Sequence, residues 1–194
     1  MSIKFIIRPL LVILIFTFQY LQAQTYSATT YKLSIKGTST MHDWSSAATN
    51  VTVQGDFVIN NGIIEKVTGG NVNVVTKSIK SDKNSGLMDS RTHETLKADK
   101  NPNITYAVTK VTGVPASGGE ASVTVSGNLN IGGTSKPTDL TLKMKVLPNG
   151  DIEIKGTKKI LMSNHGIKPP SFMLGALKVG DEVTLDIYVV LHKK

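Results

Sequence analysis

Apolar and polar residues alternate with a period of two along most of the chain beyond residue 50. Such alternation predicts strands that have one buried and one exposed face. In the first run, Gly55 separates the apolar positions and indicates a bend or a β-bulge. The runs are Val51, Val53, Phe57 and Ile59; Val72 and Val74; Ile104, Tyr106 and Val108; Val123 and Val125; Leu129 and Ile131; Leu140, Leu142, Met144 and Val146; Ile152 and Ile154; and Val183, Leu185, Ile187, Val189 and Leu191.

Turn signals lie between these runs, and they predict short connections between neighbouring antiparallel strands. About eight such strands must hide their apolar face, either by closing into a barrel or by stacking as two sheets. The pattern therefore predicts an all-β fold. The turn signals are Asn60-Asn61-Gly62, Gly69-Gly70, Ser117-Gly118-Gly119, Gly132-Gly133 and Pro148-Asn149-Gly150.

Two segments, residues 86–98 and 170–177, break the alternation and are predicted to be short helices or ordered loops. In the second segment, apolar residues recur at spacings of three and four, which is typical of one face of a helix. We expect this apolar stripe to close the mouth of a barrel as a plug or lid. Its members are Phe172, Met173, Ala176 and Leu177.

The N-terminus has the pattern of a secretory signal peptide. Lys4 and Arg8 precede an apolar run over residues 10–18, and Ala23 supplies a small residue for cleavage. The run is too short for a retained membrane-spanning helix. We therefore expect residues 1–23 to be removed on export to the periplasm, or to the outside of the cell, and residues 24–194 to fold as one domain.

Composition narrows the classes of function. The chain contains no cysteine, which excludes disulfides, thiolate metal sites and a lipid-modified cysteine. Removing Lys4 and Arg8 lowers the formal charge from +8 to +6, and the remaining lysines are dispersed along the chain. No basic stripe interleaved with aromatic residues favours nucleic-acid binding. Weak, transient attraction to an anionic membrane surface fits this charge better.

His42, Asp43 and Trp44 form the most distinctive cluster of side chains, and two interpretations remain open. In one, the His-Asp pair and the indole contact a ligand at a barrel mouth. In the other, which we favour, Trp44 anchors a strand against the core while its neighbours satisfy a turn. The other histidines, His93, His165 and His192, show no local ligand spacing with His42 or with each other, so we expect no metal site.

The charged residues of segment 86–98 have a catalytic and a structural interpretation. Two carboxylates near an arginine are able to serve acid-base chemistry. We favour a solvated short helix whose charges pair locally, because surface ion pairs are common and individually weak. The residues concerned are Asp89, Arg91, His93 and Glu94.

Three stretches carry a resemblance to a known family. The first, residues 127–140, contains a strand, the Gly132-Gly133 turn, Lys136-Pro137 and a return strand. The second runs from residues 78–79 through Asp89 to residues 100–106, and the third combines residues 162–167 with residues 179–185. Together they resemble the YceI-like family of periplasmic polyisoprenoid-binding proteins. Residues 37–44 differ from the commonest family pattern, which indicates a divergent N-terminal strand region.

The resemblance implies an extended, eight-stranded, antiparallel, lipocalin-like β-barrel with one or two short helices. It also implies non-catalytic binding or carriage of a polyprenyl chain or an isoprenoid quinone inside the barrel, with no catalytic residue and no cofactor. The oligomeric state stays open, a homodimer included. A barrel of about eight strands is wide enough to hold one slender ligand in place of core side chains.

The candidate ligand contacts are the inward positions of the strands, the apolar stripe and the mouth cluster. Two rival hypotheses remain: a β-sandwich that binds a protein or glycan without a ligand cavity, and an enzyme that uses His42 and Asp43 as an acid-base pair. The strand candidates are Phe57, Val74, Tyr106, Val125, Leu129, Leu142, Met144, Met162 and Leu185; the gate candidates are Phe172, Met173 and Leu177; the mouth candidates are His42 and Trp44.

Overall fold

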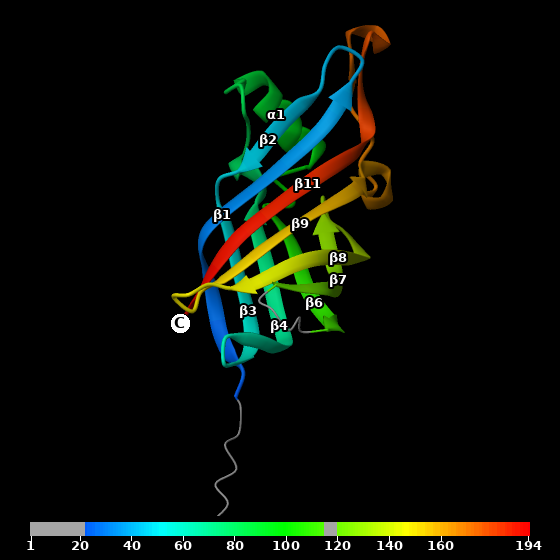
Figure 1. The fold of residues 1–194 in the computed structure, drawn as a ribbon. Helices are drawn as coiled ribbons and strands as arrows, with labels where there is room; N and C mark the ends of the chain where they lie inside the picture. Colours follow the sequence, from blue (N-terminus) through cyan, green and yellow to red (C-terminus); the bar gives the residue numbers. More distant parts are fainter. Residues whose placement is uncertain (1–21, 115–119) are drawn as a thin grey trace, which may run out of the picture.

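The strands close into a single antiparallel barrel (Figure 1). The computed structural model describes residues 22–114 and 120–194. Strand β1 pairs with β11 along one side and with β3 at its N-terminal end, and this double pairing closes the sheet. The barrel strands are β1 (Gln24–Ser39), β3 (Val51–Asn60), β4 (Ile63–Val75), β6 (Asn103–Val114), β7 (Glu120–Ile131), β8 (Thr134–Val146), β9 (Ile152–Leu161) and β11 (Leu177–Lys193).

The remaining elements gather at one end of the barrel, which we call the upper end because it lies at the top of Figure 1. Strand β2 (Trp44–Ala48) pairs with the second half of β1, and β5 (Ile79–Ser81) pairs with β2. Helix α1 (Gly86–Thr95) follows β5. The other short elements are η1 (Thr76–Ser78), η2 (Met162–His165), β10 (Ser171–Phe172) and η3 (Met173–Gly175).

The opposite end, which we call the base, has a tightly packed apolar core. The rings of Tyr26 and Phe57 meet edge to face, with their centroids 5.5 Å apart. Phe57, Ile152 and Leu191 are among the most completely buried side chains of the described residues, at 2%, 0% and 1% exposure. These positions come from β3, β9 and β11, which together with β1 are consecutive strands on one side of the barrel.

Tyr106 braces three neighbouring strands. Its ring lies over Gly127 of β7, where a Cβ atom would come within 2.6 Å of the tyrosine Cζ. The hydroxyl lies 2.8 Å from the carbonyl oxygen of Val125 and 2.9 Å from that of Thr138 on β8. Only glycine leaves room for this crossing of β7, so residue 127 has a packing role that its side-chain chemistry does not reveal.

The structure confirms the predicted all-β barrel and excludes the two stacked sheets of the rival hypothesis. The Asn61-Gly62 turn joins β3 to β4 with φ angles of 48° and 75°, as this pair of residues predicts. Gly132-Gly133 and the turn at Gly150 also connect strands. The alternating runs became β3, β4, β6, β7, β8, β9 and β11.

The Gly69-Gly70 turn was wrongly predicted, because both residues lie inside β4 opposite Asp56 and Gly55 of β3. The ladder shifts register beside them, so the glycines accommodate a bulge instead of a chain reversal. Sequence reasoning also failed to recognise β1, β2 and β5 as separate strands. The predicted Ser117-Gly118-Gly119 turn, and the signal peptide apart from residues 22 and 23, lie outside the described residues.

Candidate ligand site

The inward side chains on one wall of the upper end are less completely buried than those at the base. This wall comprises the second half of β1, the first half of β11 and the first half of β8. Leu33 and Ile35 of β1 face Ile187 and Leu185 of β11 across the ladder, on the same side of the sheet as the buried Val189. All of these except Val189 are only partly buried, although they pack against the core.

Strands β8 and β9 separate beside this wall. Their ladder runs from the Val146–Ile152 pair at the base to the Leu142–Gly156 pair, and the register includes no pair above it among the described residues. Beyond that point Leu140 continues the inner face of β8, and Lys158 continues the inner face of β9 opposite Leu185. The separation of β8 and β9 therefore borders the partly buried wall, with Leu140 on one side and Lys158 on the other.

The predicted strand contacts fall into two groups. One group is deep in the core and less than 9% exposed; the other, Met162 and Leu185, is partly buried near the upper end. Burial this complete shows side chains packed against one another, so of the strand candidates Met162 and Leu185 are best placed to meet a ligand. The deep group consists of Phe57, Val74, Tyr106, Val125, Leu129, Leu142 and Met144.

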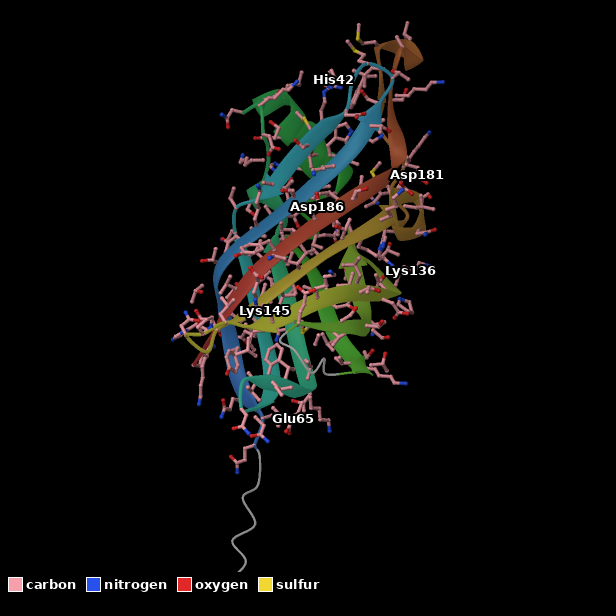
Figure 2. The ribbon with its side chains drawn as sticks, in the orientation of Figure 1. His42, Glu65, Lys136, Lys145, Asp181 and Asp186 are labelled. Atoms are coloured by element: carbon pink, nitrogen blue, oxygen red, sulfur yellow. The ribbon has the colours of Figure 1, made fainter. Side chains whose placement is uncertain are left out.

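A cavity of about 460 Å³ opens at the upper end, between β1, β2, β11 and α1. This volume lies within the range of small-molecule sites in proteins. His42 and Trp44 line it, as predicted for the mouth, and Figure 2 shows His42 at this end of the molecule, far from Glu65 at the base. The rest of the lining is Lys36, Gly37, Thr38, Asp43, Ser45, Ser81, Lys83, Met88, Glu182 and Thr184.

Trp44 combines the two roles considered for it. Its indole covers Gly37, which pairs with it across the β1–β2 ladder, and its Nε1–H donates to the carbonyl oxygen of Thr38 at 3.1 Å. The side chain is nevertheless only partly buried, because one part of it faces the cavity. An indole held in this way presents a fixed apolar surface to any occupant.

The turn before Trp44 is organised by Ser39. Its Oγ accepts from the backbone N–H groups of Met41 and His42 and donates to the carbonyl oxygen of His42 at 2.7 Å. The His42 Nδ1 lies 2.8 Å from the carbonyl oxygen of Asp43, and no hydrogen bond joins the His42 ring to the Asp43 carboxylate among the described residues. This geometry does not orient the two side chains as an acid-base pair.

The charges of α1 anchor the helix instead of pairing locally, which corrects the sequence interpretation. The Asp89 carboxylate accepts from the backbone N–H of Ser81 at 2.7 Å, and this hydrogen bond, followed by the nearby Lys80, lowers the pKa of Asp89. His93 Nε2 lies 2.9 Å from the carbonyl oxygen of Ile79. Both contacts fasten α1 to β5, so the helix forms a fixed side of the cavity.

The predicted helical stripe at residues 172–177 is wrong. Phe172 and Leu177 face each other in the β10–β11 hairpin, and both are partly buried. Met173 instead lies at the turn and is 74% exposed. The Arg91 guanidinium of α1 lies 3.7 Å from the centre of the Phe172 ring. None of the gate candidates lines the 460 Å³ cavity, so their gating role stays a prediction.

His165, also at the upper end, has a structural role. His165 is 4% exposed and its Nδ1 lies 3.1 Å from the carbonyl oxygen of Thr134, so it ties η2 to β8. No group of His, Asp or Glu residues suited to a metal ion occurs within residues 22–114 and 120–194. Over the same ranges, the structure contains no helix with the length and apolar character of a membrane span.

A closed, eight-stranded antiparallel barrel with an apolar interior defines the lipocalin-like class of fold. The sequence profile of the YceI-like domain matches residues 17–191. The chain therefore belongs to the YceI-like family, which confirms the resemblance. No match was found among curated proteins.

Solved structures support the same fold. A polyisoprenoid-binding domain from Saccharophagus degradans, implicated in plant cell wall breakdown, superposes with a TM-score of 0.65 at 14% identity, covering 89% of this chain and 99% of its own. Burkholderia cenocepacia BcnA gives 0.63 at 18% identity, with 82% and 95% covered. The Campylobacter jejuni YCEI protein gives 0.59 at 17% identity, with 77% and 84% covered.

Proposed function

We propose that this protein is exported to the periplasm and carries one isoprenoid chain, a polyprenyl lipid or an isoprenoid quinone, without catalysing a reaction. The observation that carries the proposal is the partly buried apolar wall of the upper end, beside the separation of β8 and β9. The family relationship supports it, since one structural relative is a polyisoprenoid-binding domain. In this proposal the chain lies along Leu33, Leu140 and Leu185, and its end reaches the cavity at Trp44.

Hydrophobic burial supplies the affinity. Burying hydrocarbon is worth about 0.8 kcal/mol per CH₂ group, so each five-carbon isoprene unit contributes about 4 kcal/mol. Association costs about 4–15 kcal/mol in lost freedom of motion. A single unit therefore binds poorly, and several units in contact with the wall are needed. This arithmetic favours long prenyl chains over short ones.

Lys158 is the residue that sequence reasoning missed. It occupies an inward position between Gly156 and Ile160 of β9, directly opposite Leu185. A lysine can lay its methylene groups along an apolar surface while its ammonium stays in water. In the proposed complex, the methylenes extend the wall and the ammonium lies near the polar headgroup. The alternation of apolar residues gave no signal for it, because a lysine in a strand normally indicates the exposed face.

Mass spectrometry tests the proposal directly. The protein is purified from its native host, extracted and analysed for prenyl lipids, and the purified barrel is then offered a polyprenyl phosphate and an isoprenoid quinone. We expect a co-purified lipid and saturable uptake of at least one ligand. Failure to recover any lipid, together with no uptake of either ligand, refutes carriage.

Two variants localise the ligand. Leu140→Trp and Leu185→Trp add bulk to the partly buried wall, and each should reduce uptake about tenfold or more by removing the volume of at least one isoprene unit. Ile63→Trp, at the β3–β4 turn of the base, is the matched control and should bind as the wild type does. If Leu140→Trp and Leu185→Trp take up as much lipid as the control, the ligand does not lie along the partly buried wall.

A further inference from the structure

The upper end carries a cluster of exposed apolar side chains that the barrel does not use. Met41, in the β1–β2 loop, is 67% exposed; Met173 is 74% exposed and Leu174 fully exposed in the turn before β11. In Figure 1 these two loops form the extreme upper end of the molecule. We call these three residues the apolar tip. Isolated exposed apolar residues are ordinary, whereas several on adjacent loops mark a contact surface.

The backbone holds part of this tip in a strained conformation. Met173 and Leu174 have φ angles of 53° and 54°, in the left-handed region that bulky side chains rarely adopt. Two such residues in succession cost free energy, and neither side chain gains burial in return. A strained backbone that exposes apolar side chains indicates that these side chains contact something outside the protein.

Hydrogen bonds fix the two loops of the tip to each other. The Thr40 Oγ1 donates to the carbonyl oxygen of Ala176 at 3.0 Å and accepts from the backbone N–H of Lys178 at 3.1 Å. The Thr40 N–H donates to the carbonyl oxygen of Lys178 at 3.0 Å. The loop that carries Met41 is therefore held against the hairpin that carries Met173 and Leu174.

The charge around the tip complements an anionic lipid surface. Residues 168–178 begin and end with Lys168 and Lys178 and contain no acidic residue. Both lysines are exposed. Asp43 is the nearest acid in sequence to Met41, and it lies on the side of the loop that lines the cavity. Apolar side chains flanked by lysines are the pattern of segments that sit in the interface of a bilayer with negatively charged headgroups.

We propose that the apolar tip inserts into the interface of an anionic phospholipid bilayer and so positions the barrel to exchange its lipid. The inference rests on the proposed function, because it supplies the membrane step that an isoprenoid carrier needs. His42, the residue after Met41, lines the 460 Å³ cavity, so an inserted tip brings this cavity close to the membrane surface.

Vesicle flotation tests the proposal. The full protein is mixed with phosphatidylcholine vesicles, with and without phosphatidylglycerol, and the bound fraction is measured. We expect binding to the anionic vesicles that weakens with added salt. The combined variant Met41→Ser/Met173→Ser/Leu174→Ser should bind about tenfold to a hundredfold more weakly, from the loss of exposed apolar area. Lys168→Gln/Lys178→Gln should lose most of the salt-sensitive part.

Ile63→Ser is the matched control, because it removes an exposed apolar side chain from the base and should leave vesicle binding unchanged. Trp44 fluorescence verifies that each variant is folded. Equal binding by the combined variant and the wild type, or no flotation of the wild type, overturns the inference. A wild-type dimer that the combined variant converts to a monomer overturns it in favour of self-association. Lipid recovery is measured separately by mass spectrometry. The proposal that the barrel binds a lipid and the proposal that the apolar tip binds a membrane can therefore be refuted independently.

Discussion

Gly37→Ala is the most direct perturbation of the cavity wall. A Cβ at residue 37 would lie 2.6 Å from Cε2 and 3.0 Å from Nε1 of the Trp44 indole, far inside ordinary contact distance. The ring must therefore move away and release its hydrogen bond to Thr38. Overpacking costs about 1–3 kcal/mol, and the lost hydrogen bond costs about 1 kcal/mol. We expect a loss of about 2–4 kcal/mol in the free energy of unfolding.

Urea denaturation measures this loss. With a slope near 2 kcal/mol/M, the midpoint should fall by about 1–2 M. Trp44 is the only tryptophan, so its emission reports the same event in the native state, and iodide should quench it more strongly in the variant. Gly86→Ala is the control, because no atom lies within 4 Å of its Cβ position and the residue begins α1. We expect that variant to be neutral or slightly stabilised.

Unfolding of Gly37→Ala at the wild-type urea concentration, with unchanged Trp44 emission, would show that the indole tolerates a Cβ at residue 37. A loss of equal size in both glycine variants contradicts the prediction as well, because the effect then reflects the backbone and not the contact with the indole.

The remaining predictions concern contacts that hold the barrel strands and helix α1 in place. Burial raises the pKa of Tyr106 to about 12 from its ordinary 10, so its contribution to stability is complete below pH 10 and is lost as the pH rises toward 12. Urea midpoints should fall less over this pH range in Tyr106→Phe than in the wild type, because the variant keeps only Tyr26, whose pKa burial also raises. Gly127→Ala should destabilise by about 1–3 kcal/mol, measured by thermal unfolding, because its Cβ would clash with both the Tyr106 ring and the backbone carbonyl oxygen of Ala107. Asp89→Ala should leave the Ser81 N–H without its partner at a cost of about 1–3 kcal/mol and speed its hydrogen exchange, whereas Asp89→Asn, which keeps an acceptor oxygen, should cost less.

The alternation of apolar and polar residues predicted the barrel well, because a strand with one buried face has apolar residues at every second position. Several of the turns were marked by glycine pairs or by Asn-Gly. Sequence reasoning failed where tertiary contacts decide the outcome. Gly69-Gly70 and Gly132-Gly133 look alike in sequence, yet only the second pair has positive φ angles and reverses the chain. The conformation of the first pair is determined by its pairing with strand β3.

The site was harder to predict than the fold. His42 and Trp44 were recognised because their residue types are distinctive, but the cavity lining comes from segments far apart in the sequence, which only the closed barrel brings together. Lys158 was missed because polarity normally marks the outer face of a strand. Met173 was misjudged because apolar character normally indicates burial, whereas this side chain is 74% exposed.

The tightly packed base limits how the proposed ligand could enter and leave the barrel. Because Tyr26, Phe57 and Leu191 fill the barrel there, a hydrocarbon that enters from the α1 end meets a dead end and must leave by the route through which it came. In the proposed function, the barrel would hold one ligand and exchange it at one membrane surface at a time. Movement between two membranes would then require the whole protein to diffuse across the intervening water, and delivery would be limited by encounters and not by flow through a conduit.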